Sequence, residues 1–217
     1  MPAEIPLTYT QNPRPVGFPV TYKLVSDRLV VDTVKRVDEF PLRDVEQVRL
    51  TYEPGKLARG FYKAAVRFRD GRTVSLGSVS WSSVFHSVDQ APAYGAFVAA
   101  LVAAIGEASP RARLEAGKPR LVWGAMVAVA AAIAAAIAAA VALPLSHGSP
   151  MGSLVALALG AVMAWQMGPV VRRNRPRRFT PQTLPADLLG GAGRGAAGVT
   201  PAASGSGPRG RRARGGP

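Results

Sequence analysis

The chain has 217 residues, with 27 Lys and Arg against 13 Asp and Glu, and a formal net charge of +14. It contains no cysteine, which excludes disulfides, cysteine-ligated zinc and thiol catalysis. The charge is uneven, because residues 1–120 hold 17 basic and 12 acidic side chains, whereas residues 172–217 hold ten arginines and only one acid.

The N-terminal segment 1–19 is rich in proline, at positions 2, 6, 13, 15 and 19, and has no apolar core of the length that a signal peptide needs. We therefore expect no targeting peptide, and no regular element before residue 20.

Residues 20–79 show the pattern of short strands. A polar turn at 26–28 separates two apolar stretches and predicts a hairpin, and a further strand is expected from Val45 to Tyr52. Residues 62–69 alternate apolar and mostly basic side chains, turn at Asp70 and Gly71, and resume at Val74. We count about six strands.

One amphipathic helix follows. Apolar residues recur at helical spacing between Tyr94 and Ile105, and the helix should end before Pro110. Residues 20–109 are thus predicted to form a β-rich domain capped by a helix, and residues 110–120 a basic linker.

This order of elements resembles the bacterial pleckstrin-homology-like (PH-like) domains of small membrane proteins. The resemblance covers residues 16–109 and depends on the turn at 26–28, the Phe40-Pro41-Leu42-Arg43-Asp44-Val45 segment, the Asp70-Gly71 hairpin and the helix near residues 94–105. It implies a bent antiparallel barrel closed by the helix, and a role in interactions at membranes. Phosphoinositide-binding members of the wider fold cluster Lys and Arg on the first strands, a cluster that this chain lacks.

Two uncharged apolar runs, Leu121–Leu143 and Met151–Val171, are the strongest feature of the sequence. As helices they would measure about 35 and 32 Å, enough for a hydrocarbon core of roughly 30 Å. Residues 121–143 and 151–171 are therefore predicted to form a transmembrane hairpin, joined by an extracytoplasmic turn at 144–150. A buried alanine-rich helix is the alternative, but two such uncharged runs in succession are unusual for a soluble domain.

Basic residues flank both runs, whereas the turn has no Lys or Arg, so the positive-inside rule places both termini in the cytoplasm of an inner-membrane protein. These flanking cations are candidate contacts for anionic lipid headgroups. They are Arg111, Arg113, Lys118, Arg120, Arg172, Arg173, Arg175, Arg177 and Arg178.

The second run carries a small residue at every fourth position, which permits close helix contact. The stripe comprises Gly152, Ala156, Gly160, Ala164 and Gly168. It is expected to pack within the hairpin in preference to a second copy of the chain in a homo-oligomer.

Residues 172–217 are predicted to be a disordered basic tail, in which only Leu184–Leu189 has the apolar character needed to dock on the domain or a partner. No catalytic residue, metal site or cofactor is expected, because His86 and His147 lack a convincing partner.

The fold class is thus an α+β membrane protein. The predicted function is a non-enzymatic membrane protein whose cytoplasmic domain binds a protein partner or the anionic lipid surface, and nucleic acid is not an expected partner. An alternative is a small subunit of a transport or channel assembly.

Overall fold

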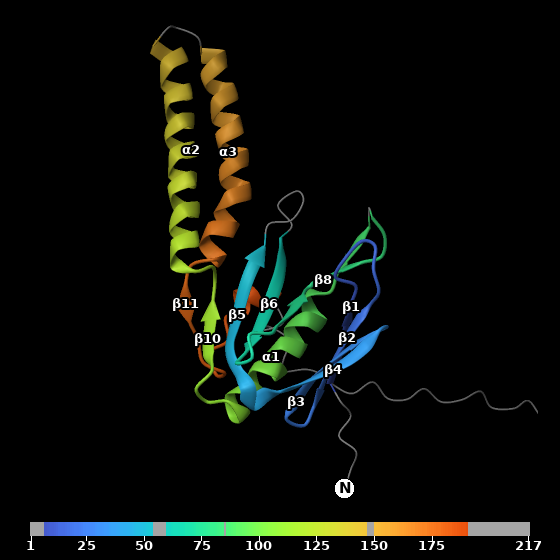
Figure 1. Ribbon diagram of the computed structural model, residues 1–217. Helices are drawn as coiled ribbons and strands as arrows, with labels where there is room; N and C mark the ends of the chain where they lie inside the picture. Colours follow the sequence, from blue (N-terminus) through green and yellow to red (C-terminus); the bar gives the residue numbers. More distant parts are fainter. Residues whose placement is uncertain (1–6, 54–59, 85, 147–149, 191–217) are drawn as a thin grey trace, which may run out of the picture.

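The computed structural model describes residues 7–53, 60–84, 86–146 and 150–190. It is an α+β fold in which two sheets and a helix form one core, and two long helices extend from it (Figure 1). The first sheet has the order β1-β2-β3-β4, with each neighbouring pair antiparallel. Its strands are β1 (Leu7–Gln11), β2 (Val20–Val25), β3 (Arg28–Thr33) and β4 (Arg36–Pro41).

A short 3₁₀ turn, Leu42–Asp44, leads into the second sheet, whose order is β11-β10-β5-β6-β7. It contains β5 (Val45–Glu53), β6 (Phe61–Phe68), β7 (Thr73–Gly77), β10 (Arg113–Ala116) and β11 (Arg177–Arg178). Strand β10 runs parallel to β5, and the other pairs are antiparallel. A separate hairpin, β8 (Val79–Trp81) and β9 (Ser87–Asp89), precedes the first helix.

The two predicted hairpins are confirmed. Ser26 has φ of 48° in the turn between β2 and β3, and Gly71 has φ of +83° between β6 and β7, a conformation that glycine adopts without a steric penalty. The strand predicted over residues 45–52 is also confirmed as β5.

The expectation of about six strands is wrong, because the described residues form eleven. Strand β1 lies inside the proline-rich segment, because residues 7–12 are free of proline and the first five of them pair with all but the last residue of β2. Strand β4 was not predicted because half of its side chains are charged and only Phe40 is buried. The other strands that were not predicted, β8 to β11, have two to four residues, too few for a clear alternation.

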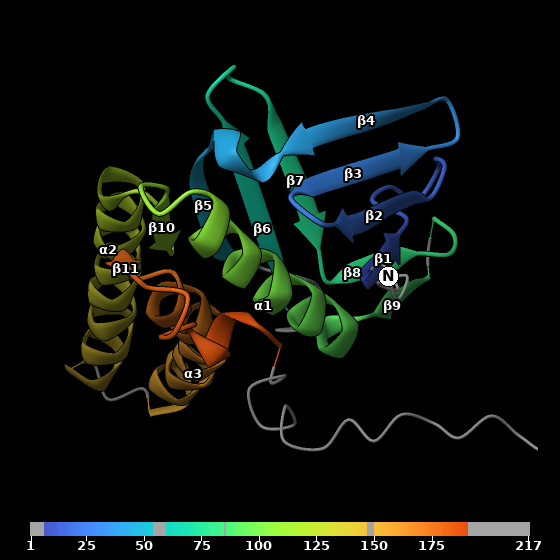
Figure 2. The ribbon, with the colours of Figure 1, turned by 90° about the horizontal axis from the view of Figure 1, so that it is seen from below.

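Helix α1 (Ala91–Ala108) confirms the predicted helix and its buried face. Tyr94, Phe97, Val98, Leu101, Val102 and Ile105 are all at most 1% exposed. Figure 2 shows α1 running across the sheets, with the chain after α3 folded beside it. Tyrosine hydroxyls join the two sheets: Tyr9 donates to the Gly77 carbonyl at 2.6 Å and Tyr22 to the Ser75 carbonyl at 2.9 Å. Burial raises the pKa of Tyr22.

Helices α2 (Arg120–Ser146) and α3 (Pro150–Arg173) are an antiparallel pair. Near the sheets, Trp123 Nε1 donates to the Val171 carbonyl at 3.0 Å, and at the far end Ser153 Oγ donates to the Val141 carbonyl at 2.8 Å. Helix α2 continues to residue 146, so the predicted turn at 144–150 is shorter than expected, and residues 147–149 lie outside the described part.

Three helices among the described residues are long and apolar enough to cross a membrane: α1, residues 120–143 of α2, and α3. Helix α1 uses its apolar face in the core. In α2 and α3, by contrast, large apolar side chains are exposed along the length, with Leu121 at 90%, Leu154 at 61% and Leu157 at 59%. An apolar surface of this extent is unfavourable in water and is typical of helices in lipid.

The predicted linker and tail are partly built into the fold. Linker residues 113–116 form β10, and tail residues 177–178 form β11, beside a 3₁₀ turn at Ala186–Leu188. Phe179, Leu188 and Leu189 are at most 9% exposed and belong to the core, which confirms that the apolar interruption docks on the domain. The prediction of disorder is therefore wrong for residues 172–190, whereas residues 191–217 lie outside the described part.

Candidate functional site

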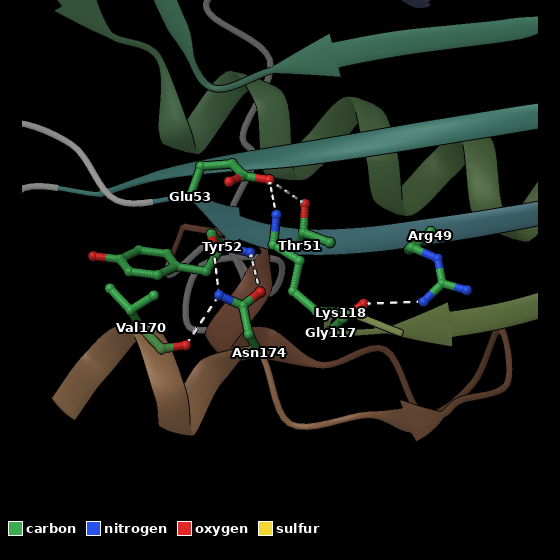
Figure 3. Close-up of polar contacts among 8 residues, drawn as sticks. All are labelled: Arg49, Thr51, Tyr52, Glu53, Gly117, Lys118, Val170 and Asn174. Carbon is green, nitrogen blue, oxygen red and sulfur yellow. Dashed lines mark hydrogen bonds and ion pairs between the residues drawn. The ribbon is translucent and has the colours of Figure 1, made fainter. Parts of the chain in front are cut away.

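The most specific polar arrangement lies where the helical pair meets the second sheet, at the end of α3 (Figure 3). Asn174 is fully buried. Its side-chain Oδ1 accepts the backbone N–H of Tyr52 at 3.1 Å, and its Nδ2 donates to the carbonyls of Tyr52 at 2.5 Å and Val170 at 3.0 Å. The amide thus satisfies both backbone groups of Tyr52, as a peptide unit of a neighbouring strand would.

This amide continues the edge of β5 where β10 ends. Ala116 is the last residue of β10 in register with β5, opposite Leu50, and the N–H of Gly117 still donates to the Leu50 carbonyl at 2.7 Å. Two residues further along β5, the Asn174 side chain provides the next hydrogen bond to the strand edge. We refer to Gly117, Lys118, Tyr52 and Asn174 as the junction.

Gly117 is required at the junction for two reasons. Its φ is +84°, a left-handed conformation that side chains disfavour, and a Cβ would overlap the carbonyl oxygens of Asn174 and Arg175. Its neighbour Lys118 donates its backbone N–H to the Asn174 carbonyl at 3.0 Å, and its Nζ pairs with Glu53 at 2.6 Å. The chain entering α2 and the chain leaving α3 are therefore bound to each other and to the same strand.

An arginine covers the outer side of the junction. The Arg173 guanidinium lies 4.7 Å from the ring centroid of Tyr52 and 6.0 Å from that of Tyr62, and donates to the Tyr62 hydroxyl at 3.2 Å. Cation–π contact of this kind favours arginine over lysine. Contacts with β5 and β6, and the short connection from β10, thus hold the helical pair in one orientation relative to the sheets.

The nine predicted lipid contacts divide into two groups. Four have protein partners: Arg113 pairs with Glu46 at 2.6 Å, Lys118 with Glu53, Arg177 with Asp187, and Arg173 with the tyrosines. For the side chains of the other five, no ion pair or hydrogen bond is found among the described residues. These are Arg111, Arg120, Arg172, Arg175 and Arg178.

The position of β10 explains why the nine predicted lipid-contact cations do not lie together at one level beside the helices. Arg111 and Arg113 precede or begin β10, which runs toward α2, so they lie at the end of that strand away from the helices. Arg120, Arg172 and Arg175 lie at the ends of α2 and α3 nearest the sheets, beside the junction. These cations flank the two apolar runs in the sequence, but the sequence pattern did not predict that strand β10 separates some of them from the helices.

The predicted small-residue stripe is only partly in the helix contact. A Cβ on Gly160 would lie 2.7 Å from Ile137 Cγ2, so this glycine permits the close approach of α2. Gly168 has open space at its Cβ position, and Ala164 is exposed. Together with Gly160 they line an apolar groove of about 340 Å³ between the two helices, with Arg172 at one end. Ala156 is half-buried and Gly152 is exposed.

The described residues contain no group of three or more His, Asp or Glu side chains that could hold a metal ion. Ser83 Oγ accepts the backbone N–H of His86 at 3.1 Å within the turn between β8 and β9. A second cavity, of about 400 Å³, lies beside α1 and has Glu107 as its one charged lining residue among those described. No protein-family model, curated protein or solved structure matches this chain.

Proposed function

We propose that this protein is a membrane-anchored, non-enzymatic module. In this proposal α2 and α3 cross the inner membrane as a hairpin, and the sheets lie on its cytoplasmic side, where they bind the anionic lipid surface or a protein partner. The observation that carries the proposal is the junction. Two helices with exposed apolar surfaces are fastened to the sheet through a buried asparagine, so the hairpin sets the orientation of the sheets.

Charge supports the orientation. At the ends of α2 and α3 nearest the sheets, Arg120, Arg172 and Arg175 have no ion-pair partner in the described part of the chain, whereas residues 144–150 at the other end contain no Lys or Arg. An excess of Lys and Arg at one end of the transmembrane helices indicates that this end is cytoplasmic. Each cation close to an anionic bilayer surface also contributes about 1 kcal/mol of attraction.

The order of elements supports the resemblance to PH-like domains. The antiparallel strands β1 to β7 precede a helix that covers the core, and the resemblance likewise implies antiparallel strands closed by a helix. The additions are the β8–β9 hairpin and strands β10 and β11, and the last two connect the domain to the helical pair.

A transport or channel role, the alternative from the sequence, has little to support it. The runs 121–143 and 151–171 contain no ionisable side chain, which ion or proton pathways normally need.

Single-cysteine accessibility tests the proposal, because the natural chain has no cysteine. Ser146→Cys, at the last residue of α2, should react with an impermeant maleimide in intact cells. Ala96→Cys, on the exposed side of α1, should react only after permeabilisation. Reaction at position 96 in intact cells would contradict the orientation, and extraction of the full chain by carbonate would contradict the anchor.

A further inference from the structure

Exposed apolar residues occur on two chain connections that meet at one end of the first sheet. Val16 is 79% exposed and Phe18 is 59% exposed in the connection between β1 and β2, and Val84 is 52% exposed in the turn between β8 and β9. Single exposed apolar residues are common, but several on adjacent connections form a surface that a partner covers. We call Val16, Phe18 and Val84 the apolar tip.

Hydrogen bonds hold the two connections of the tip together. The Trp81 N–H donates to the Asn12 carbonyl at 2.9 Å, and the Asn12 N–H donates to Ser80 Oγ at 2.9 Å. The turn of the second connection is closed by the Ser82 N–H, which donates to the His86 carbonyl at 3.0 Å. Prolines restrict the backbone of the first connection. The tip is thus a defined feature of the fold.

The tip is directed toward the side on which the helical pair lies. Figure 1 shows α2 and α3 extending from one side of the sheets, with the β1–β2 connection and the β8–β9 turn directed the same way. Because the junction fixes the helices to β5, and the shared core fixes the first sheet to the second, this direction is built into the fold.

Charge at the same end of the sheet favours a lipid surface over an apolar protein surface. Arg14 lies in the β1–β2 connection, and Lys35 lies in the neighbouring β3–β4 turn. Neither side chain has an ion-pair partner among the described residues, and both are exposed. Apolar side chains beside free cations match the boundary between acyl chains and anionic headgroups.

We propose that the apolar tip inserts into the headgroup region of the same bilayer that α2 and α3 cross. The inference rests on the proposed function, since it takes the helical pair as the anchor. Because the hairpin already holds the chain at the membrane, tip insertion is an intramolecular event and needs only a few apolar side chains. The domain is thereby attached to the bilayer at two places, the junction and the tip.

The experiment uses the full chain in vesicles of phosphatidylcholine and phosphatidylglycerol. Val84→Cys carries an environment-sensitive fluorophore, and nitroxide groups are placed on the lipid headgroups or deep in the acyl chains. We expect blue-shifted emission and quenching by the headgroup nitroxide at position 84. Val25→Cys is the matched control, because it is also an exposed valine, 42% exposed, at the opposite end of β2.

A third label separates this inference from the proposed function. Val129→Cys lies within α2 and should be quenched by the deep nitroxide. Absence of that quenching would refute the membrane anchor itself. Quenching at position 129 without any difference between positions 84 and 25 would overturn the tip alone and leave that surface to a protein partner.

Charge variants complete the test. Val16→Asp with Phe18→Asp should abolish quenching at position 84 while leaving position 129 unchanged, and Val25→Asp should alter neither. In vesicles of phosphatidylcholine alone, quenching at position 84 should persist, because insertion uses apolar contact. Its complete loss there would overturn insertion in favour of an electrostatic surface contact through Arg14 and Lys35.

Discussion

Asn174→Ala should loosen the attachment of the helical pair to the sheet. The substitution removes three hydrogen bonds and leaves the buried N–H of Tyr52 without a partner. Leaving one buried donor unsatisfied costs about 1–3 kcal/mol, and the two lost hydrogen bonds to carbonyls, at about 0.5 kcal/mol each, together add about 1 kcal/mol. We therefore expect the free energy of unfolding to fall by about 2–4 kcal/mol.

The measurement is a thermal melt of the full chain in detergent, followed by intrinsic tryptophan fluorescence. Trp123 is a suitable reporter, because its indole donates to the Val171 carbonyl three residues before Asn174. For a chain of this size the expected loss corresponds to a melting temperature lower by about 4–16 °C.

Asn12→Ala is the matched control. Asn12 Oδ1 is buried and has no hydrogen-bond partner among the described residues, so its removal leaves no new group unsatisfied and should cost far less. Equal shifts for Asn12→Ala and Asn174→Ala would refute the reasoning, because the hydrogen bonds of Asn174 would then contribute nothing beyond side-chain volume.

Three further predictions follow from other parts of the structure. Gly160→Leu should separate the helices at Ile137 and reduce cysteine crosslinking between α2 and α3, whereas Leu157→Ala, on an exposed position, should not; equal crosslinking would show that the close contact is unimportant. Leu188→Ala should destabilise the fold by about 2–5 kcal/mol in a thermal melt, because this tail residue is fully buried; an unchanged melt would show that the tail is dispensable. Burial raises the pKa of Tyr22, so the folded state resists ionisation of this group and stability should fall as pH rises above about 10; Tyr22→Phe should reduce that alkaline loss.

Much of the fold follows from patterns within short stretches of sequence. Helix α1 could be predicted because its apolar residues repeat at helical spacing, and the β6–β7 hairpin because strict alternation brackets Asp70 and Gly71. The long runs that became α2 and α3 needed only their length and lack of charge. These signals are local, because each depends only on residues that are close together in the sequence.

The site depended on contacts that local patterns do not carry. Asn174 follows a basic helix end and has no periodicity, yet it satisfies the backbone of Tyr52, 122 residues earlier in the chain. Phe179 has few apolar neighbours in sequence and lay in the tail predicted to be disordered, whereas Leu188 lies in the one apolar stretch expected to dock; both are ordered by a core built from other segments. The helices, the main hairpins and the distribution of charge could be predicted from the amino-acid pattern, because each of these arises from neighbouring residues. The junction, the path of the tail and the grouping of the apolar tip could not, because backbone groups and apolar surfaces far apart in the chain contact one another only after folding.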